Sequence, residues 1–301
     1  MGRAGRSRAG APLEDSPIFA GKTRSESGTC ATTVAQWGED RAHALQTALR
    51  ISAERALHLD VLEMHYLALA ADYDGTLAED GKVRPEVLAA LSGLKERGRK
   101  LVLVTGRELD ELLVAFPAIG VFDRVVAENG ALLYTPSTRR ERPLAKPPPA
   151  EFAVSLRARG VTPLSCGRVI VATWQPHEQV VLNVIREQGL ELEVIFNKGA
   201  VMVLPSGVNK ATGLMAALDA LGIERARVVG VGDAENDHSL LDACGLGVAV
   251  ANAVPALKRR ADFVTAGARG EGIIELCRQM AATDLADVER RSAPLSPVST
   301  R

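Results

Sequence analysis

Apolar residues occur along most of the chain as short uninterrupted runs, separated by polar segments and by stretches of helical length. Such runs are typical of strands buried on both faces, as in a parallel sheet between helices. Six of them predict strands, at residues 66–71, 100–105, 123–128, 226–232, 246–251 and 262–265. Helices are expected between them, for example at 85–97 and 209–222, and a last one at 271–281. This order predicts a doubly wound, mostly parallel α/β sheet.

Residues 132–203 interrupt this rhythm. They open on a polar, proline-rich link, after which the pattern predicts helices at 151–159 and 175–188 and strands at 168–174, 191–196 and 200–204. We therefore expect an inserted small α+β domain at 132–203 with its own sheet. The core would then consist of residues 64–131 and 204–284.

The two ends of the chain lack this pattern. Residues 1–63 form an N-terminal extension whose first part, rich in Gly, Ser, Arg and Thr, is expected to be disordered, whereas 38–63 could form one amphipathic helix. Met64 directly precedes the first predicted strand, so translation from Met64 is an alternative that would leave the extension out. Residues 285–301 are expected to be a disordered tail.

Composition narrows the class of protein. A net charge of −1 gives no basic field for nucleic acid or a membrane surface, and 4% aromatic residues argue against a base-stacking platform. No apolar run reaches the roughly 18 residues of a membrane span. The four cysteines are scattered without a C-x-x-C pair, which favours reduced thiols in a cytoplasmic protein over disulfides or a zinc site. The oligomeric state is not predicted.

Polar residues gather where three of the core strands end, which is where ligands bind in open α/β sheets. They are Asp72 and Asp74 after the first strand, Thr105, Gly106 and Arg107 after the second, and Asp233, Asn236 and Asp237 after the fourth. Lys210 begins the helix that precedes the fourth strand. Because burying an unpaired charge is costly, we expect the carboxylates to meet a metal, a cation or a reaction.

Taken together, these residues resemble the haloacid dehalogenase (HAD) phosphatase superfamily. Its four motifs are an Asp-x-Asp-Gly-Thr, a Ser/Thr after the second strand, a Lys, and a Gly-Asp-x-x-x-Asp, and all four are present in order. The stretches AENGA (127–131), GVNKATGL and GDAENDHSLL, and the position of the insert, are similar to the type IIB or Cof-like branch. This resemblance covers residue 66 to about residue 280, and it implies a Rossmann-like core with a C2-type cap.

The resemblance also implies a Mg²⁺-dependent phosphomonoester hydrolase that forms an aspartyl-phosphate. Asp72 would be the nucleophile, because a carboxylate can form this intermediate, and Asp74 would donate and accept protons. The Mg²⁺ ligands would be Asp72, Asp74, Asp233 and Asp237, with Asp74 binding through its backbone carbonyl and Asp237 acting either as a ligand or by orienting the ligands. The substrate would be a small phosphorylated metabolite such as a sugar phosphate or phosphoglycolate.

The remaining positions concern substrate binding. Thr105, Gly106 and Lys210 are expected at the phosphoryl group, and Asn129 and Asn236 near the substrate. Arg168, Trp174, His177, Asn197 and Lys198 of the insert could also reach a leaving group. For each of these five we predict a packing or surface role, and none of them is assigned to the site.

Two other functions stay open at this point. One is a phosphomutase, since a C2-capped relative transfers phosphate between sugar hydroxyls. The other is a non-hydrolytic regulatory module that binds a phosphorylated ligand. A dehalogenase is disfavoured, because that activity lacks the second aspartate of the first motif, which is present here as Asp74.

Overall fold

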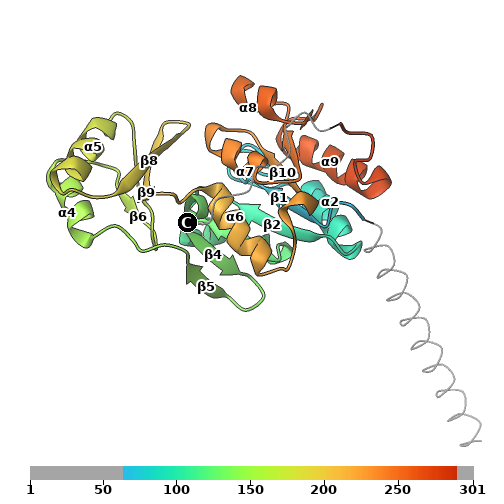
Figure 1. The fold of residues 1–301 in the computed structure, drawn as a ribbon, viewed down its shortest axis with the longest axis horizontal. Helices are drawn as coiled ribbons and strands as arrows, with labels where there is room; N and C mark the ends of the chain where they lie inside the picture. Colours follow the sequence, from blue (N-terminus) through green and yellow to red (C-terminus); the bar gives the residue numbers. More distant parts are fainter. Residues whose placement is uncertain (1–63, 290–301) are drawn as a thin grey trace, which may run out of the picture. The chain divides into compact units, whose positions relative to one another are not determined.

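The computed structural model describes residues 64–289, which are built around an eight-stranded sheet in the order β12-β11-β10-β1-β2-β3-β4-β5 (Figure 1). Six strands run parallel, and β4 and β5 extend the sheet in an antiparallel direction. The bounds are β1 Ala68–Ala71, β2 Lys100–Val104, β3 Arg124–Ala127, β4 Leu132–Thr135, β5 Arg140–Pro143, β10 Val228–Gly232, β11 Leu246–Ala249 and β12 Phe263–Val264. The predicted fold class and its six core strands are confirmed.

Helices cover both faces of this sheet. Strand β1 shows the two layers: Leu69 and Ala71 pack in the apolar cluster that includes the helices of one face, and Ala68 and Ala70 pack in the cluster on the other. This two-sided burial explains why the strands read as continuous apolar runs. The first face carries α2 (Pro85–Glu96), α3 (Leu109–Ala115) and α9 (Arg269–Thr283), and the second carries α6 (Lys210–Asp219), α7 (His238–Asp242) and α8 (Pro255–Arg260).

A second, four-stranded antiparallel sheet has the order β6-β7-β9-β8. Its strands are β6 Ser165–Cys166, β7 Val171–Trp174, β8 Leu192–Asn197 and β9 Ala200–Pro205, and its helices are α4 (Ala150–Ala158) and α5 (Glu178–Glu187). Phe152, Leu156, Val181 and Val184 of these helices pack against the sheet in a separate apolar cluster. We call residues 150–205 the cap.

The expected bounds of the insert, 132 and 203, differ from those of the cap. Residues 132–143 form the β4–β5 hairpin of the main sheet, and β9 continues the cap sheet through Pro205. The physical reason is that β5 is an exposed edge strand of sequence RERP, which carries no apolar signal and reads as a polar link. The main sheet therefore extends further along the chain than the hydrophobic pattern predicts.

The core also extends beyond residue 284, its expected C-terminal bound. Leu285 is only 3% exposed and belongs to the main apolar cluster, and Val288 packs against that cluster. The backbone N–H groups of His65 and Tyr66 donate to the Asp284 carboxylate, which ties the start of β1 to the end of α9. The expected tail at 285–301 is therefore wrong for its first residues. The predictions for residues 1–63 and 290–301 lie outside the described part of the chain.

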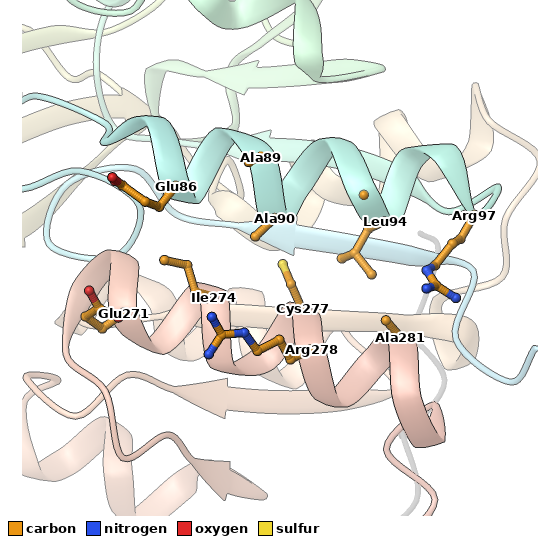
Figure 2. A pocket seen from close by; sticks show the side chains of 11 residues that line it. Glu86, Ala89, Ala90, Leu94, Arg97, Glu271, Ile274, Cys277, Arg278 and Ala281 are labelled. Atoms are coloured by element: carbon orange, nitrogen blue, oxygen red, sulfur yellow. The ribbon is translucent and has the colours of Figure 1, made fainter.

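A shallow pocket of about 580 Å³ lies between α2 and α9 (Figure 2). Figure 2 shows Ala90 and Leu94 of α2 pointing toward Ile274 and Cys277 of α9. None of the predicted site residues lines this pocket. Within residues 64–289, no helix is both long and apolar enough to cross a membrane.

Candidate active site

The candidate site lies where β1, β2 and β10 end. These three strands are parallel neighbours, so the loops that follow them emerge at one edge of the sheet. Asp72 follows β1, and Asp233 and Asp237 follow β10. One carboxylate oxygen from each of these three aspartates lies within 4.8 Å of the others. We refer to Asp72, Asp233 and Asp237 as the carboxylate cluster.

Lys210 holds two members of this cluster together. Its ammonium lies 2.6 Å from Asp72 Oδ1 and 2.5 Å from Asp237 Oδ1, and its side chain is 1% exposed. The other Asp237 oxygen accepts the backbone N–H groups of Asp233 and Ala234, each at 2.9 Å. Asp237 is thus a positioning residue that fixes the loop after β10, and its lone pairs are satisfied inside the protein.

The position of Lys210 next to the cluster is set by where helix α6 begins. Asn209 caps this helix, because its side-chain oxygen accepts the N–H groups of Ala211 and Thr212, and Thr212 completes a capping box. Helix α6 therefore begins at Lys210, and its first side chain reaches the strand ends. Although Lys210 lies in the first turn of a helix, its side chain is buried and not solvated.

The charged groups of the cluster change one another's pKa values. Burial raises the pKa of Asp72 to about 7, repulsion from Asp237 adds to this, and Lys210 opposes it. Burial also disfavours the charge on Lys210, but the carboxylates of Asp237 and Asp72 outweigh it and raise the pKa of the ammonium. One buried cation is shared between two carboxylates. A further cation at the cluster would therefore favour the ionised form of Asp72.

Asp74 contributes differently from the other three aspartates. Its carboxylate accepts hydrogen bonds from Arg107 Nε and Nη2, both at 2.7 Å, and it is not part of the carboxylate cluster. Its backbone carbonyl faces Asp233, since both accept hydrogen bonds from the Lys198 ammonium. The structure therefore brings Asp74 to the cluster through its carbonyl. Arg107, which had no assigned role, holds the Asp74 side chain bidentately.

The predicted substrate-binding residues form a second set of contacts. Thr105 Oγ1 accepts the Arg107 backbone N–H at 3.2 Å, and the Thr105 carbonyl accepts the Asn129 N–H at 2.9 Å. Asn129 Oδ1 in turn accepts from Asn236 Nδ2 at 3.0 Å. Gly106 faces the cap, because a Cβ at this position would lie 3.4 Å from Met202 Sδ. Thr105, Asn129 and Asn236 are thus brought together beside the carboxylate cluster.

Two residues at the site were not predicted. Lys198, expected on the surface or in packing, lies in the turn between β8 and β9 and donates to the Asp74 carbonyl and to Asp233. Asn252 Nδ2 donates to the Gly75 carbonyl at 2.8 Å and to Asp233 Oδ2 at 3.3 Å. The signal for Lys198 was its place between two predicted strands, where a tight turn projects a side chain. Asn252 follows β11, another parallel strand end.

Glu128 anchors the cap to the core. Its fully buried carboxylate accepts the backbone N–H groups of Arg168, Val169 and Ile170 at 2.8, 2.7 and 2.9 Å. The chain entering β7 wraps closely around it, since a Cβ at Gly167 would lie 2.6 Å from Glu128 Oε1. A buried carboxylate with three N–H donors is a strong, charge-assisted contact.

Glu128→Gln should therefore lower the free energy of unfolding by about 1–3 kcal/mol. The amide keeps the shape, but its NH₂ group would face backbone N–H donors instead of accepting from them. Denaturation by urea measures the change. Glu141→Gln is the matched control, because Glu141 pairs with Arg168 at an exposed position, where such pairs contribute about 0–1 kcal/mol. Equal stability of the two variants would contradict the anchor.

The residues at the cluster fit a divalent cation. Carboxylate and carbonyl oxygens are the ligands that Mg²⁺ prefers, and Asp72, Asp233 and the Asp74 carbonyl supply them. A positively charged group, the Lys198 ammonium, already lies against two of these ligands. Close approach also requires Gly75, which has a φ of +86°. A Cβ there would lie 2.3 Å from Asp233 Oδ2.

Comparison with known proteins gives matches over most of the described residues. Residues 69–148 and 177–276 match the family model described as haloacid dehalogenase-like hydrolase. The chain is 34% identical over 218 residues to a phosphoglycolate phosphatase of Methanothermobacter thermautotrophicus, a match covering 70% of this chain and 97% of that protein. It is 33% identical over 220 residues to a phosphoglycolate phosphatase of Methanopyrus kandleri, covering 69% and 94%.

Solved structures agree on the fold. A Thermoplasma acidophilum protein superimposes with a TM-score of 0.62 at 15% identity, covering 72% of this chain and 98% of that chain. A haloacid dehalogenase-like hydrolase from Bacteroides thetaiotaomicron gives a TM-score of 0.60 at 20% identity, covering 71% and 99%. The four motifs, the geometry of the carboxylate cluster and these matches agree, and the chain belongs to the haloacid dehalogenase-like hydrolase family.

Proposed function

We propose that this phosphatase is a Mg²⁺-dependent phosphomonoester hydrolase that works through an aspartyl-phosphate on Asp72. The observation that carries the proposal is the position of Asp72: its carboxylate is held by the buried Lys210 next to Asp233 and Asp237, at the end of β1. This arrangement gives one carboxylate a fixed orientation and a cationic neighbour. Both are needed for attack on a phosphate ester, which is itself negatively charged.

The chemistry can be written with the residues of this chain. An Asp72 oxygen attacks phosphorus, the bond from phosphorus to the ester oxygen breaks, and Asp74 protonates the departing alkoxide. Asp74 then accepts a proton from water as that water attacks the aspartyl-phosphate. The bond from phosphorus to Asp72 breaks, which releases inorganic phosphate and regenerates the carboxylate. Lys210 balances the negative charge on the phosphoryl oxygens throughout.

Arg107 and Asp237 support these steps without reacting. Arg107 orients the Asp74 carboxylate through its two hydrogen bonds, and Asp237 orients the loop that carries Asp233. Mg²⁺ would be held by Asp72, Asp233 and the Asp74 carbonyl. When bound, it neutralises charge on the phosphoryl group as a Lewis acid.

For the substrate we propose a small anionic metabolite of the phosphoglycolate type, with sugar phosphates as the next class. The support is that the relatives at 33–34% identity are named phosphoglycolate phosphatases and span almost their whole length in the match. We further propose that the cap sorts substrates and that the protein works in the cytoplasm, where the free thiols of Cys166, Cys244 and Cys277 stay reduced.

The test is release of inorganic phosphate from a panel of phosphate esters, with purified full-length protein and Mg²⁺. The panel contains phosphoglycolate, several sugar phosphates and an aryl phosphate. We expect turnover of the small anionic esters with phosphoglycolate preferred. No phosphate release from any ester would refute the proposed reaction, whereas a preference for sugar phosphates would change only the substrate.

Chelation should remove this activity. We expect EDTA to abolish phosphate release and added Mg²⁺ to restore it, because the carboxylates of Asp72 and Asp233 and the phosphate repel one another without a cation. Mg²⁺ at 100 times its dissociation constant should also stabilise the fold by about 2.7 kcal/mol. Thermal unfolding with and without Mg²⁺ measures this. Asp233→Asn should lose the shift, and full activity in EDTA would contradict the metal requirement.

A further inference from the structure

The cap reaches the carboxylate cluster through one side chain, Lys198. Its ammonium lies 2.9 Å from the Asp74 carbonyl oxygen, and 2.9 and 3.1 Å from the two Asp233 carboxylate oxygens. The Lys198 side chain is 44% exposed, whereas that of Asp233 is 5% exposed. A partly exposed lysine thus places its charged end against a carboxylate that is almost fully buried.

The backbone explains how a cap residue reaches so far. Asn197 of β8 pairs with Ala200 of β9, so Lys198 and Gly199 form the turn of a two-residue hairpin. Both have positive φ values, 49° and 87°, as such turns require. Gly199 lies beside Trp174 of β7, because a Cβ at position 199 would lie 3.9 Å from Trp174 Cε3. The turn thus projects Lys198 beyond the edge of the cap sheet.

The contacts of Lys198 coincide with those expected of the divalent cation. Both use the Asp74 carbonyl and the Asp233 carboxylate. A Mg²⁺ ion at about 2.1 Å from these oxygens would overlap with an ammonium at hydrogen-bond distance from the same atoms. The two cations therefore cannot be bound together.

Formal charges favour the exchange. The carboxylate cluster contributes three negative charges, and Lys198 and Lys210 contribute two positive charges, so the set carries −1. With Mg²⁺ in place of Lys198, the set is neutral (−3, +1 and +2). A divalent ion thus neutralises the charge of the buried carboxylates more completely than the lysine does. The lysine, however, is part of the chain, so its local concentration at the site is high.

We propose that Lys198 holds the cation position in the metal-free protein and is displaced from it when a divalent cation binds. Binding of the cation would then break the contacts of Lys198 with the core, so the β8–β9 turn would be released from the core at the same time. Lys198 acts here as a positioning residue, which competes with the cation for ligands. The proposal rests on the Mg²⁺ site of the proposed function, and its test separates the two.

The first measurement is Mg²⁺ affinity, by isothermal titration calorimetry without substrate, on wild type, Lys198→Gln and Arg186→Gln. We expect Lys198→Gln to bind Mg²⁺ about threefold to tenfold more tightly, because a competitor for two ligands is removed. Arg186 is exposed on α5 of the cap, so Arg186→Gln makes the same change in net charge and should match wild type. Circular dichroism confirms that each variant is folded.

The second measurement is the reactivity of Lys198 toward an amine-acetylating reagent, read by peptide mass spectrometry. Mg²⁺ should raise Lys198 labelling several-fold in wild type. Asp233→Asn should show raised labelling even without Mg²⁺, and the exposed Lys146 should not respond. Equal Mg²⁺ affinity of wild type and Lys198→Gln, or labelling that ignores Mg²⁺, overturns the exchange but leaves the metal site intact. If neither protein binds Mg²⁺, both proposals fail.

Discussion

Asp72→Asn should reduce phosphate release by about 10⁴-fold or more while the fold stays intact. The amide has nearly the same shape, and its oxygen can still accept the hydrogen bond that Lys210 donates to Asp72 Oδ1 at 2.6 Å. It cannot attack phosphorus, however, so the covalent route is closed. Steady-state kinetics with Mg²⁺ measure the loss, and thermal unfolding checks that the variant is folded.

Asp219→Asn is the matched control for this change. Asp219 is exposed at the end of α6, so the same substitution there should leave the rate unchanged. Acid-quenched reaction with a ³²P-labelled ester should leave label on wild type and none on Asp72→Asn. A variant that keeps a tenth of the wild-type rate would exclude Asp72 as the nucleophile.

Lys210→Gln should lower the free energy of unfolding by about 3–5 kcal/mol and reduce the rate by about 10²-fold or more. The reason is that Lys210 is the shared partner of Asp72 and Asp237, and all three side chains are buried. Without it, two carboxylates face each other in a low dielectric. Urea denaturation and phosphate release measure the two effects.

A second substitution separates the two effects of Lys210. In the double variant Lys210→Gln, Asp237→Asn, one of the facing charges is removed, so part of the stability should return while the rate stays low. Lys146→Gln, at an exposed position, should change neither quantity. Stability of Lys210→Gln within about 0.5 kcal/mol of wild type would be typical of a surface site and would contradict the buried pairing.

The sequence predicts the central strands well because a strand that is buried on both faces has an uninterrupted apolar sequence. Strands such as β1 and β10 are covered on both faces, so every residue in them must be apolar or small. The edge strand β5 has no such requirement, and its polar sequence hides a strand that is held by pairing with β4. Leu285 and Val288 are a similar case, since two apolar side chains in a short segment do not define a helical or strand period.

For the site, the sequence predicts which residues meet but not how each is oriented. Asp72, Asp233, Asp237 and Lys210 come together as expected, because strand order and helix start fix their positions. The pairing of the Asp74 carboxylate with Arg107 depends on side-chain geometry between two loops, which no spacing encodes. The contact of Lys198 depends on how cap and core face each other, and that is a tertiary property.

The neighbour of this lysine gives the molecule a built-in fluorophore. Trp174 is 53% exposed and lies beside Gly199, next to the turn that carries Lys198. The only other tryptophan in the chain is Trp37. In a Trp37→Phe background, the indole emission would therefore come from a single position at the tip of the cap. Its wavelength and quenching by iodide would follow that turn in real time, in a stopped-flow mixing experiment, without an attached dye.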